Sequence, residues 1–155
     1  MANVCMFTGH RDIRREDLSS LADWLEITAE SLIESGATEF CVGGAMGFDT
    51  LAALKVIEKK AKYGYIKLRL FLPCKDQSAF WHQNHKMTYA YILKNADSIT
   101  YASEKYTRGC MHKRNRDMVN AADVCVAYCS KSEGGTYYTL SQAQKKGIEI
   151  INFFK

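Results

Sequence analysis

The stretch FCVGGAMGFDTLAALKVIEKKA, residues 40–61, joins a short apolar run, a turn with three glycines and an amphipathic segment. The apolar run before the glycines is typical of a buried strand. After the turn, one set of residues recurs at the spacing of a single helix face: Thr50, Ala53, Leu54, Ile57 and Ala61. The stretch therefore predicts a strand followed by a helix, which is the repeating unit of α/β folds.

The same alternation runs along the whole chain. Strands are expected at 4–8, 40–42, 65–73, 98–103, 124–129 and 148–154, and helices at about 18–36, 50–61, 84–95, 111–122 and after Gly135. Six strands separated by helices predict an α/β fold in three layers, with a mainly parallel sheet covered on both faces. The chain has a single proline and no low-complexity linker, so residues 1–155 are expected to form one domain.

Composition narrows the class of protein. The formal net charge is +4 over 155 residues, and without a long basic stripe it argues against a nucleic-acid partner. No apolar run approaches the length of a membrane span, and the six cysteines have no zinc-type spacing. These features predict a cytoplasmic protein with reduced thiols, no membrane partner and no metal.

The turn at 43–47 presents Gly43, Gly44 and Gly47 between a strand and a helix. Exposed backbone amides and the positive end of the helix dipole suit an anion such as phosphate. The spacing matches neither the P-loop nor the dinucleotide GxGxxG pattern, so a tight corner remains an alternative. Asp49 is either part of a site or a cap for the helix.

Two other loops at the same edge of the sheet carry polar residues. The sequence SEGGT ends in Gly134, Gly135 and Thr136 at the start of the last helix, which is a second geometry suited to an anion. The loop after the first strand is rich in groups that contact ligands, and its candidates are Thr8, Gly9, His10 and Arg11. In open parallel sheets, ligands bind beyond the carboxyl ends of the strands, which is where all three loops are expected.

Arg114 lies on the apolar face of the helix predicted at 111–122, between Met111 and Met118. A guanidinium on a packed face needs a carboxylate, an anionic ligand or a route along the edge of that face to water. Together with the two glycine-rich turns, Arg114 indicates a ligand that carries phosphate and lies across the top of the sheet.

A family resemblance rests on five motifs that follow one another along nearly the whole chain: FTGHR, GGAMGFDTLAA, LPC, ADSITYASEKYTRGCMHKRNRDMVNAADVCVAY and GGTYYTLSQAQKKG. They resemble the YpsA-like group of the SLOG superfamily, named after the Smf/DprA proteins and the cytokinin-activating LOG enzymes. The resemblance implies a Rossmann-like domain that binds a nucleotide or nucleotide-derived ligand, and the dimers common among LOG relatives imply a homodimer.

LOG enzymes cleave the N-glycosidic bond of nucleoside 5′-monophosphates with an arginine of an MHxRK motif and the glutamate of PGGxGTxxE. By this resemblance Arg114 takes the arginine position, and Gly135 with Thr136 takes the Gly-Thr pair. The glutamate position holds Thr139, which cannot carry the negative charge that this chemistry uses. Glu133 and Asp49 are the substitute carboxylates.

The sequence leaves three hypotheses open. The first is a domain that binds or senses a nucleotide, phosphoribosyl or ADP-ribose-like ligand, the second is a LOG-type hydrolase with Arg114, Asp49 and Glu133 as catalytic candidates, and the third is a DprA-like module for single-stranded DNA. The predicted ligand-binding residues are Thr8, Gly9, His10, Arg11, Gly43, Gly44, Ala45, Gly47, Asp49, Arg114, Asn115, Gly134, Gly135 and Thr136.

Overall fold

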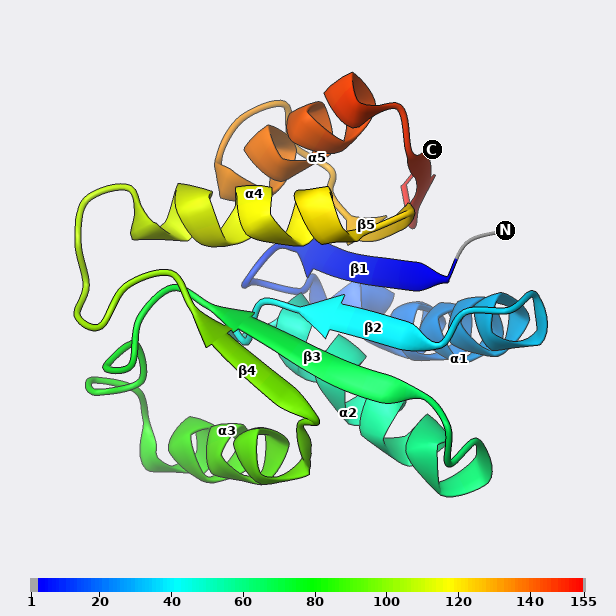
Figure 1. Cartoon of the computed structure of the whole chain (residues 1–155), viewed down its shortest axis with the longest axis horizontal. Coiled ribbons are helices and arrows are strands. Elements are labelled where there is room, and N and C mark those ends of the chain that lie inside the picture. The colour runs from blue at the N-terminus through cyan, green and yellow to red at the C-terminus, as the bar shows by residue number, and fades with distance from the viewer. Residues whose placement is uncertain (1–2, 155) are drawn as a thin grey trace.

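The protein is described by a computed structural model that covers residues 3–154. Strands and helices alternate along the chain (Figure 1). The strands are β1 (Val4–Gly9), β2 (Glu39–Val42), β3 (Lys67–Leu72), β4 (Ser98–Tyr101), β5 (Val124–Tyr128) and β6 (Glu149–Asn152). The helices are α1 (Leu18–Glu34), α2 (Phe48–Lys62), α3 (Gln83–Asn95), α4 (Cys110–Ala121) and α5 (Gly135–Lys146), and a 3-10 turn, η1 (Arg15–Asp17), precedes α1.

All pairings between neighbouring strands are parallel, and the order in the sheet is β4-β3-β2-β1-β5-β6. The predicted three-layer α/β fold with six strands is therefore confirmed. Element boundaries differ from the sequence-based ones by a few residues, because strand pairing rather than apolar character fixes where a strand ends. The ends of the predicted domain, residues 1–2 and 155, lie outside the described residues.

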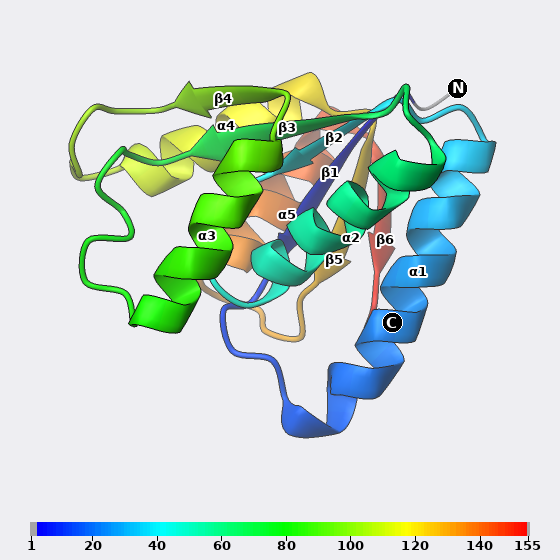
Figure 2. The same ribbon diagram turned by 90° about the horizontal axis from the view of Figure 1, so that it is seen from below.

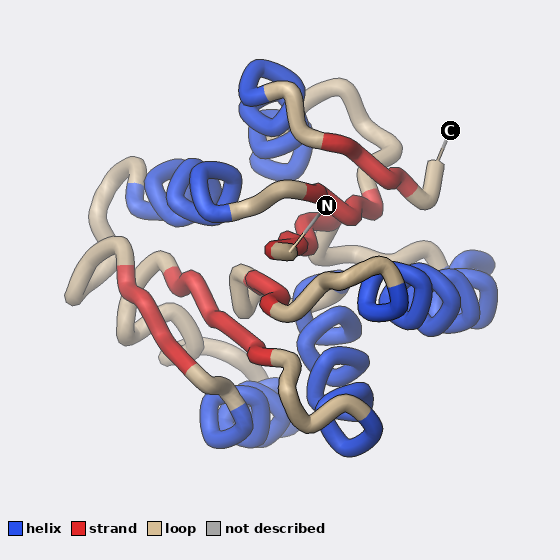
Figure 3. The backbone as a smooth tube through the Cα atoms, turned by 45° about the vertical axis from the view of Figure 1, so that its right-hand side comes forward, coloured by secondary structure: helices blue, strands red, loops and turns tan. Residues whose placement is uncertain are grey.

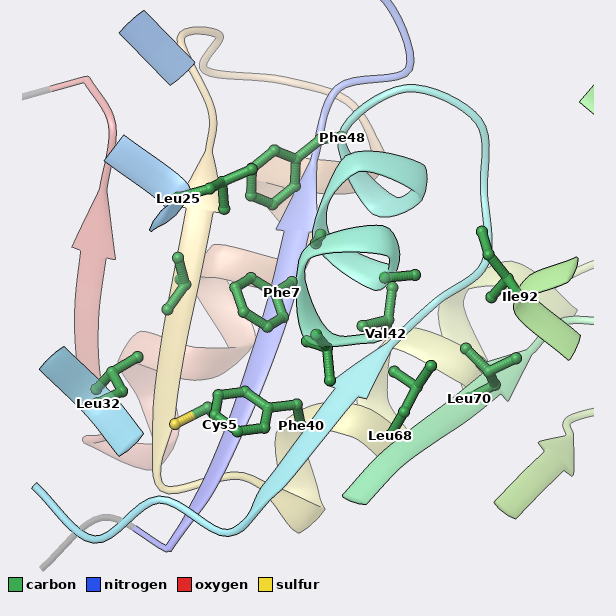
Figure 4. Packing of buried hydrophobic residues seen from close by; sticks show 14 of the residues in the cluster. Cys5, Phe7, Leu25, Leu32, Phe40, Val42, Phe48, Leu68, Leu70 and Ile92 are labelled. Atoms are coloured by element: carbon green, nitrogen blue, oxygen red, sulfur yellow. The ribbon is translucent and has the colours of Figure 1, made fainter. Parts of the chain in front are cut away.

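Helices cover both faces of the sheet (Figures 1 and 3). Figure 2 shows α1, α2 and α3 in front of one face, while α4 and α5 lie behind the other. Successive side chains of β1 serve the two faces in turn, because side chains alternate along a strand. Phe7 joins the core under α1–α3 (Figure 4), and Met6 joins the smaller core under α4 and α5.

The order of the strands determines where a site can form. From β1 the chain builds outward through β2 to β4, and it then crosses to the other side of β1 for β5 and β6. The adjacent carboxyl ends of β1 and β5 are thus the point where the strand order reverses, with Gly9 opposite Tyr128. Ligands of open α/β sheets bind in the crevice at such a point.

Three further observations concern membrane spans, cysteines and metal sites. Among the helices that the structure describes, none is long and apolar enough to cross a bilayer. All six cysteines are buried and unpaired. Within residues 3–154, no group of three or more His, Cys, Asp or Glu side chains has the arrangement that a metal ion needs.

Candidate functional site

A pocket of about 310 Å³ opens at the carboxyl ends of β1 and β5. It is formed by the end of β1, the loops after β1, β2 and β5, the first turns of α2 and α5, and one face of α4. The predicted residues that line it are Thr8, Gly9, His10, Arg11, Ala45, Asp49, Arg114, Asn115, Glu133, Gly134, Gly135 and Thr136. The fold therefore brings residues from four separate segments of the chain to one cavity.

The three glycines of the turn after β2 lie outside the pocket lining. The Gly44 carbonyl accepts a hydrogen bond from Gln77 Nε2 at 3.2 Å, and Gly44 has a φ of +72°. Gly47, with a φ of +80°, lies so close to the loop after β1 that a Cβ there would be 2.0 Å from the Arg11 carbonyl oxygen. The turn thus behaves as a tight corner at its glycines and contributes Ala45 and Asp49 to the pocket.

The first turn of α5 is open toward the pocket. Gly134, with a φ of +93°, precedes the helix, and the first backbone bond within the helix runs from the Tyr138 amide to the Gly134 carbonyl at 2.9 Å. The amides of Gly135 and Thr136 therefore precede the helical ladder and have no partner within it. Around Gly135, no heavy atom lies within 4 Å of the position a Cβ would take. This end of the pocket has the geometry that favours an anion.

Arg114 is 5% exposed and bonds to the protein rather than to a carboxylate. Its Nη1 donates to the carbonyl oxygens of Gly43 and, at 3.4 Å, Phe71, while Nε donates to Asn115 Oδ1 at 2.6 Å. Over residues 3–154, no carboxylate oxygen lies within 4.0 Å of the guanidinium. The expected carboxylate partner is therefore absent among these residues, and carbonyls at the ends of β2 and β3 solvate the charge. The anionic ligand expected at Arg114 stays a prediction.

Asp49 lies beside Arg114 and is 6% exposed. Its Oδ2 accepts a hydrogen bond from the Ala45 amide at 3.2 Å. Ala45 belongs to the turn before α2, and the helix has no side-chain cap, so the predicted capping of the first helical turn by Asp49 is wrong. Its Oδ1 is buried and has no hydrogen-bond partner among the described residues. Burial raises the pKa of Asp49 to about 6, although Arg114, the Ala45 amide and Arg11 oppose that rise. Perturbed carboxyls of this kind are frequent at functional sites.

A family model named YpsA and described as the YspA SLOG family matches residues 5–153. The chain belongs to this SLOG family. Among its relatives, the SPbeta prophage-derived protein YoqJ of Bacillus subtilis is 29% identical over 133 residues, which are 78% of each chain. A UPF0398 protein of Bacillus cereus is 29% identical over 126 residues, which are 79% of this chain and 68% of the relative.

Two solved structures share the SLOG fold of this chain. DNA processing protein A (DprA) of Streptococcus pneumoniae superposes with a TM-score of 0.70 at 17% identity, over 97% of this chain and 50% of that chain. DprA of Helicobacter pylori has a TM-score of 0.70 at 20% identity, over 97% of this chain and 64% of that chain. The SLOG chain thus spans between half and two thirds of the DprA chains.

The structural relatives correct one sequence-based expectation. The H. pylori DprA is described as binding single-stranded DNA, so the expectation that nucleic acid is not a partner of this fold is wrong. The argument failed because it used the net charge of the whole SLOG chain. Binding of nucleic acid depends on the local clustering of basic residues, and a total charge of +4 does not show where these residues cluster.

His10 holds the two central loops of the SLOG fold together. Its Nε2 accepts a hydrogen bond from the Ser130 amide at 2.9 Å, and its own amide donates to the Tyr128 carbonyl at 3.2 Å. Partial burial and the nearby Lys131 lower the pKa of His10, which keeps the ring neutral with the proton on Nδ1. His10 lines the pocket, and its contacts give it a positioning role.

The position of the LOG glutamate holds Thr139 in this SLOG chain, and its side chain does not face the pocket lining. Thr139 is fully buried, and its Oγ1 donates to the Gly135 carbonyl at 2.9 Å within α5. Glu133 lines the pocket from an exposed position. Of the two substitute carboxylates, Asp49 alone is buried with a raised pKa.

Five lining residues were not predicted: Asp12, Met111, His112, Met118 and Lys131. Asp12 and Lys131 lie in the loops after β1 and β5, where a wider window around the predicted motifs would have included them. Met111 and Met118 were assigned to the packed face of α4, and sequence spacing does not show that this face ends at a cavity.

Proposed function

We propose that this SLOG protein binds a nucleotide or a phosphoribosyl or ADP-ribose-like derivative in the pocket between β1 and β5. The open first turn of α5 is the observation that carries the proposal, because its free amides and helix dipole favour a phosphate group. Membership of the SLOG family and the fold shared with DprA support a role associated with nucleotides or DNA.

The lining of the pocket suits such a ligand. Arg11 and Lys131 supply positive charge at the exposed loops, and Arg114 adds a buried one. The pocket volume of about 310 Å³ is at the lower end of the range of small-molecule sites, roughly 300–1,000 Å³. A mononucleotide, or one half of a dinucleotide, matches this size.

Replacing Gly135 with proline tests the role of the α5 amides. Proline is well tolerated at the first position of a helix, so the fold is expected to survive while one N–H of the cradle is lost. Losing a hydrogen bond to a charged phosphate is expected to weaken AMP binding about 10-fold, measured by isothermal titration calorimetry.

Gly135→Ala is the matched control. It retains the N–H, and its Cβ enters open space, so AMP affinity is expected to stay close to that of the unmodified protein. If both variants bind AMP equally well, the phosphate does not lie on α5. If the unmodified protein binds neither AMP nor ADP-ribose, the proposal is wrong.

Binding of single-stranded nucleic acid is the second candidate. A second pocket of about 380 Å³ adjoins the first and shares His112 with it. Its lining includes Arg108, Lys113 and Arg116. Of these, Lys113 pairs with Asp117 at 3.0 Å, whereas Arg108 and Arg116 have no carboxylate within 4.0 Å among the described residues. A strand that runs from one pocket to the next would meet positive charge in both.

The double variant Arg108→Gln/Arg116→Gln is expected to weaken binding of a fluorescent oligothymidine, measured by anisotropy at several salt concentrations. The slope of log affinity against log salt is expected to become less steep by about 1.4, because two phosphate contacts are lost. Arg15→Gln/Lys94→Gln removes the same charge at exposed positions outside both pockets. Equal losses in the two double variants would mean that the strand is attracted only by overall charge.

A LOG-type hydrolase receives less support. Thr139 is held within α5 and Glu133 is exposed, so Asp49 would have to supply the carboxylate alone. Asp49 bonds to the Ala45 amide and lies beside a guanidinium that stabilises its charge. This environment suits binding of a ligand better than removal of a proton from water. The homodimer, the cytoplasmic location and the single domain over 1–155 stay predictions.

A further inference from the structure

Asp49 Oδ1 is the one buried side-chain oxygen or nitrogen, within residues 3–154, that has no hydrogen-bond partner. Buried polar atoms in folded proteins are nearly always paired, so an unpaired carboxylate oxygen calls for an explanation. The other oxygen of the same group is paired with the Ala45 amide at 3.2 Å. The carboxylate is therefore held in a fixed orientation with one acceptor free.

No hydrogen bond from the neighbouring guanidinium reaches this acceptor, and two of the three Arg114 nitrogens bond to other groups. Arg114 directs Nη1 to the carbonyls of Gly43 and Phe71 and Nε to Asn115. Gly43 has no side chain, and a Cβ there would lie 2.9 Å from Asp49 Oδ2 and 2.6 Å from Arg114 Nη1. Since Asp49 lines the pocket, a molecule bound there can supply the donor.

The charges near Asp49 define the chemistry of that donor. A phosphate group, with a charge of about −1.5 to −2 at pH 7, is repelled by a carboxylate. A cationic group would add to the positive charge of Arg114 and Arg11, which already face Asp49. A neutral O–H or N–H donor fits. Pentose hydroxyls occur in every ligand of the class proposed above, whereas base N–H groups differ from one base to another.

We propose that Asp49 Oδ1 accepts a hydrogen bond from a pentose hydroxyl of the bound ligand, so that the site selects ribonucleotides over their deoxy counterparts. This inference rests on the proposed nucleotide site and adds a specificity-determining residue to it. The phosphate end lies at α5, and the hydroxyl end lies at the turn between β2 and α2.

The same contact couples binding to pH. Donation to Oδ1 stabilises the ionised carboxylate, so it lowers the pKa of Asp49, which lies at about 6 without ligand. The bound state then holds fewer protons, binding releases a proton, and affinity rises as the pH rises through about 6. The groups that face Asp49 are Arg114 from α4, Arg11 from the loop after β1 and the Ala45 amide.

The test compares AMP, 2′-deoxy-AMP, 3′-deoxy-AMP and IMP by calorimetry on the unmodified protein and on Asp49→Asn. Asparagine keeps an oxygen for the Ala45 amide and places an NH₂ donor where Oδ1 was. Loss of one hydroxyl is expected to weaken binding to the unmodified protein about 10-fold or more. Asp49→Asn is expected to weaken AMP binding to a similar degree and to bind the deoxy forms as well as AMP. It is also expected to lose the part of the pH dependence that Asp49 contributes, whereas the AMP phosphate, with a second pKa of about 6, titrates alike in both proteins.

Asp23→Asn is the matched control, since it removes one exposed carboxylate of α1 outside the pocket and is expected to keep the preference for AMP. If AMP and both deoxy forms bind alike, the inference is wrong and the nucleotide site stands. If IMP alone binds weakly, the donor is a base N–H and the pentose assignment is wrong. If none of the four binds, the proposed nucleotide function fails and this inference fails with it.

Discussion

Gly47→Ala is expected to destabilise the protein by about 4 kcal/mol, which sums a cost of about 1–3 kcal/mol for backbone strain and a similar one for overpacking. Gly47 has φ +80° and ψ −125°, a conformation that alanine rarely adopts. Its Cβ would lie 2.0 Å from the Arg11 carbonyl oxygen. Backbone atoms cannot rotate away as a flexible side chain can, so the loop after β1 must separate from α2.

Thermal unfolding followed by circular dichroism is the measurement, and a fall in melting temperature of about 10 °C is expected for a chain of this size. Gly134→Ala is the matched control. Gly134 has φ +93° and ψ −178°, which is also a glycine conformation, but no heavy atom lies within 4 Å of its Cβ position. Equal losses in the two variants would show that strain alone sets the cost and that the contact with Arg11 contributes nothing.

Gly47 and Gly134 show which features of the site the sequence alone does not predict. The turns GGAMG and EGGT look alike as sequences, because both place glycines between a strand and a helix. In the structure, the first is packed against Arg11 and Arg114, and the second faces open space. The role of a glycine depends on what lies opposite its missing side chain, and that neighbour comes from a distant part of the chain.

The fold was predictable because its signals are local. Apolar runs ended by glycine or proline mark the strands, and the repeat of three to four residues marks the helices. Parallel pairing then places all the loops that follow strands at one edge, which explains why most of the predicted site residues, from four segments, line one pocket. The order of strands, and with it the adjacency of β1 and β5, was beyond local patterns.

The buried charges were predictable only in part. The spacing around Arg114 indicated a packed position, and the structure has it 5% exposed. Besides the Asn115 side chain, its partners are the backbone carbonyl oxygens of Gly43 and Phe71, which were not predictable because every residue has a carbonyl. Because Arg114 donates to these carbonyls and not to Asp49, one oxygen of the Asp49 carboxylate stays available to a ligand.

Arg114→Met is expected to destabilise the protein by about 4 kcal/mol at pH 7, the typical cost of removing one member of a buried group of charges. Methionine fills much of the volume, but the Gly43 and Phe71 carbonyls lose their donor and Asp49 loses its nearest positive charge. Urea unfolding is the measurement. Arg116→Met is the control, because Arg116 is exposed and a change of about 0.5 kcal/mol or less is expected there.

The pH dependence of this loss separates the electrostatic cause from simple repacking. Burial already raises the pKa of Asp49 from 3.8 to about 6, and removing Arg114 raises it further. A carboxyl whose pKa is raised by folding contributes most stability below its unfolded pKa, and that contribution is lost as the pH rises through the folded pKa. The loss in free energy of unfolding caused by Arg114→Met is therefore expected to shrink from pH 7 to pH 5, because Asp49 takes up a proton in this range.

In an Asp49→Asn background, Arg114→Met is expected to lower the free energy of unfolding by at least about 1 kcal/mol less and to show no such pH dependence. A deficit that is equal at both pH values and in both backgrounds would mean that Arg114 stabilises the protein through its bonds to carbonyls alone.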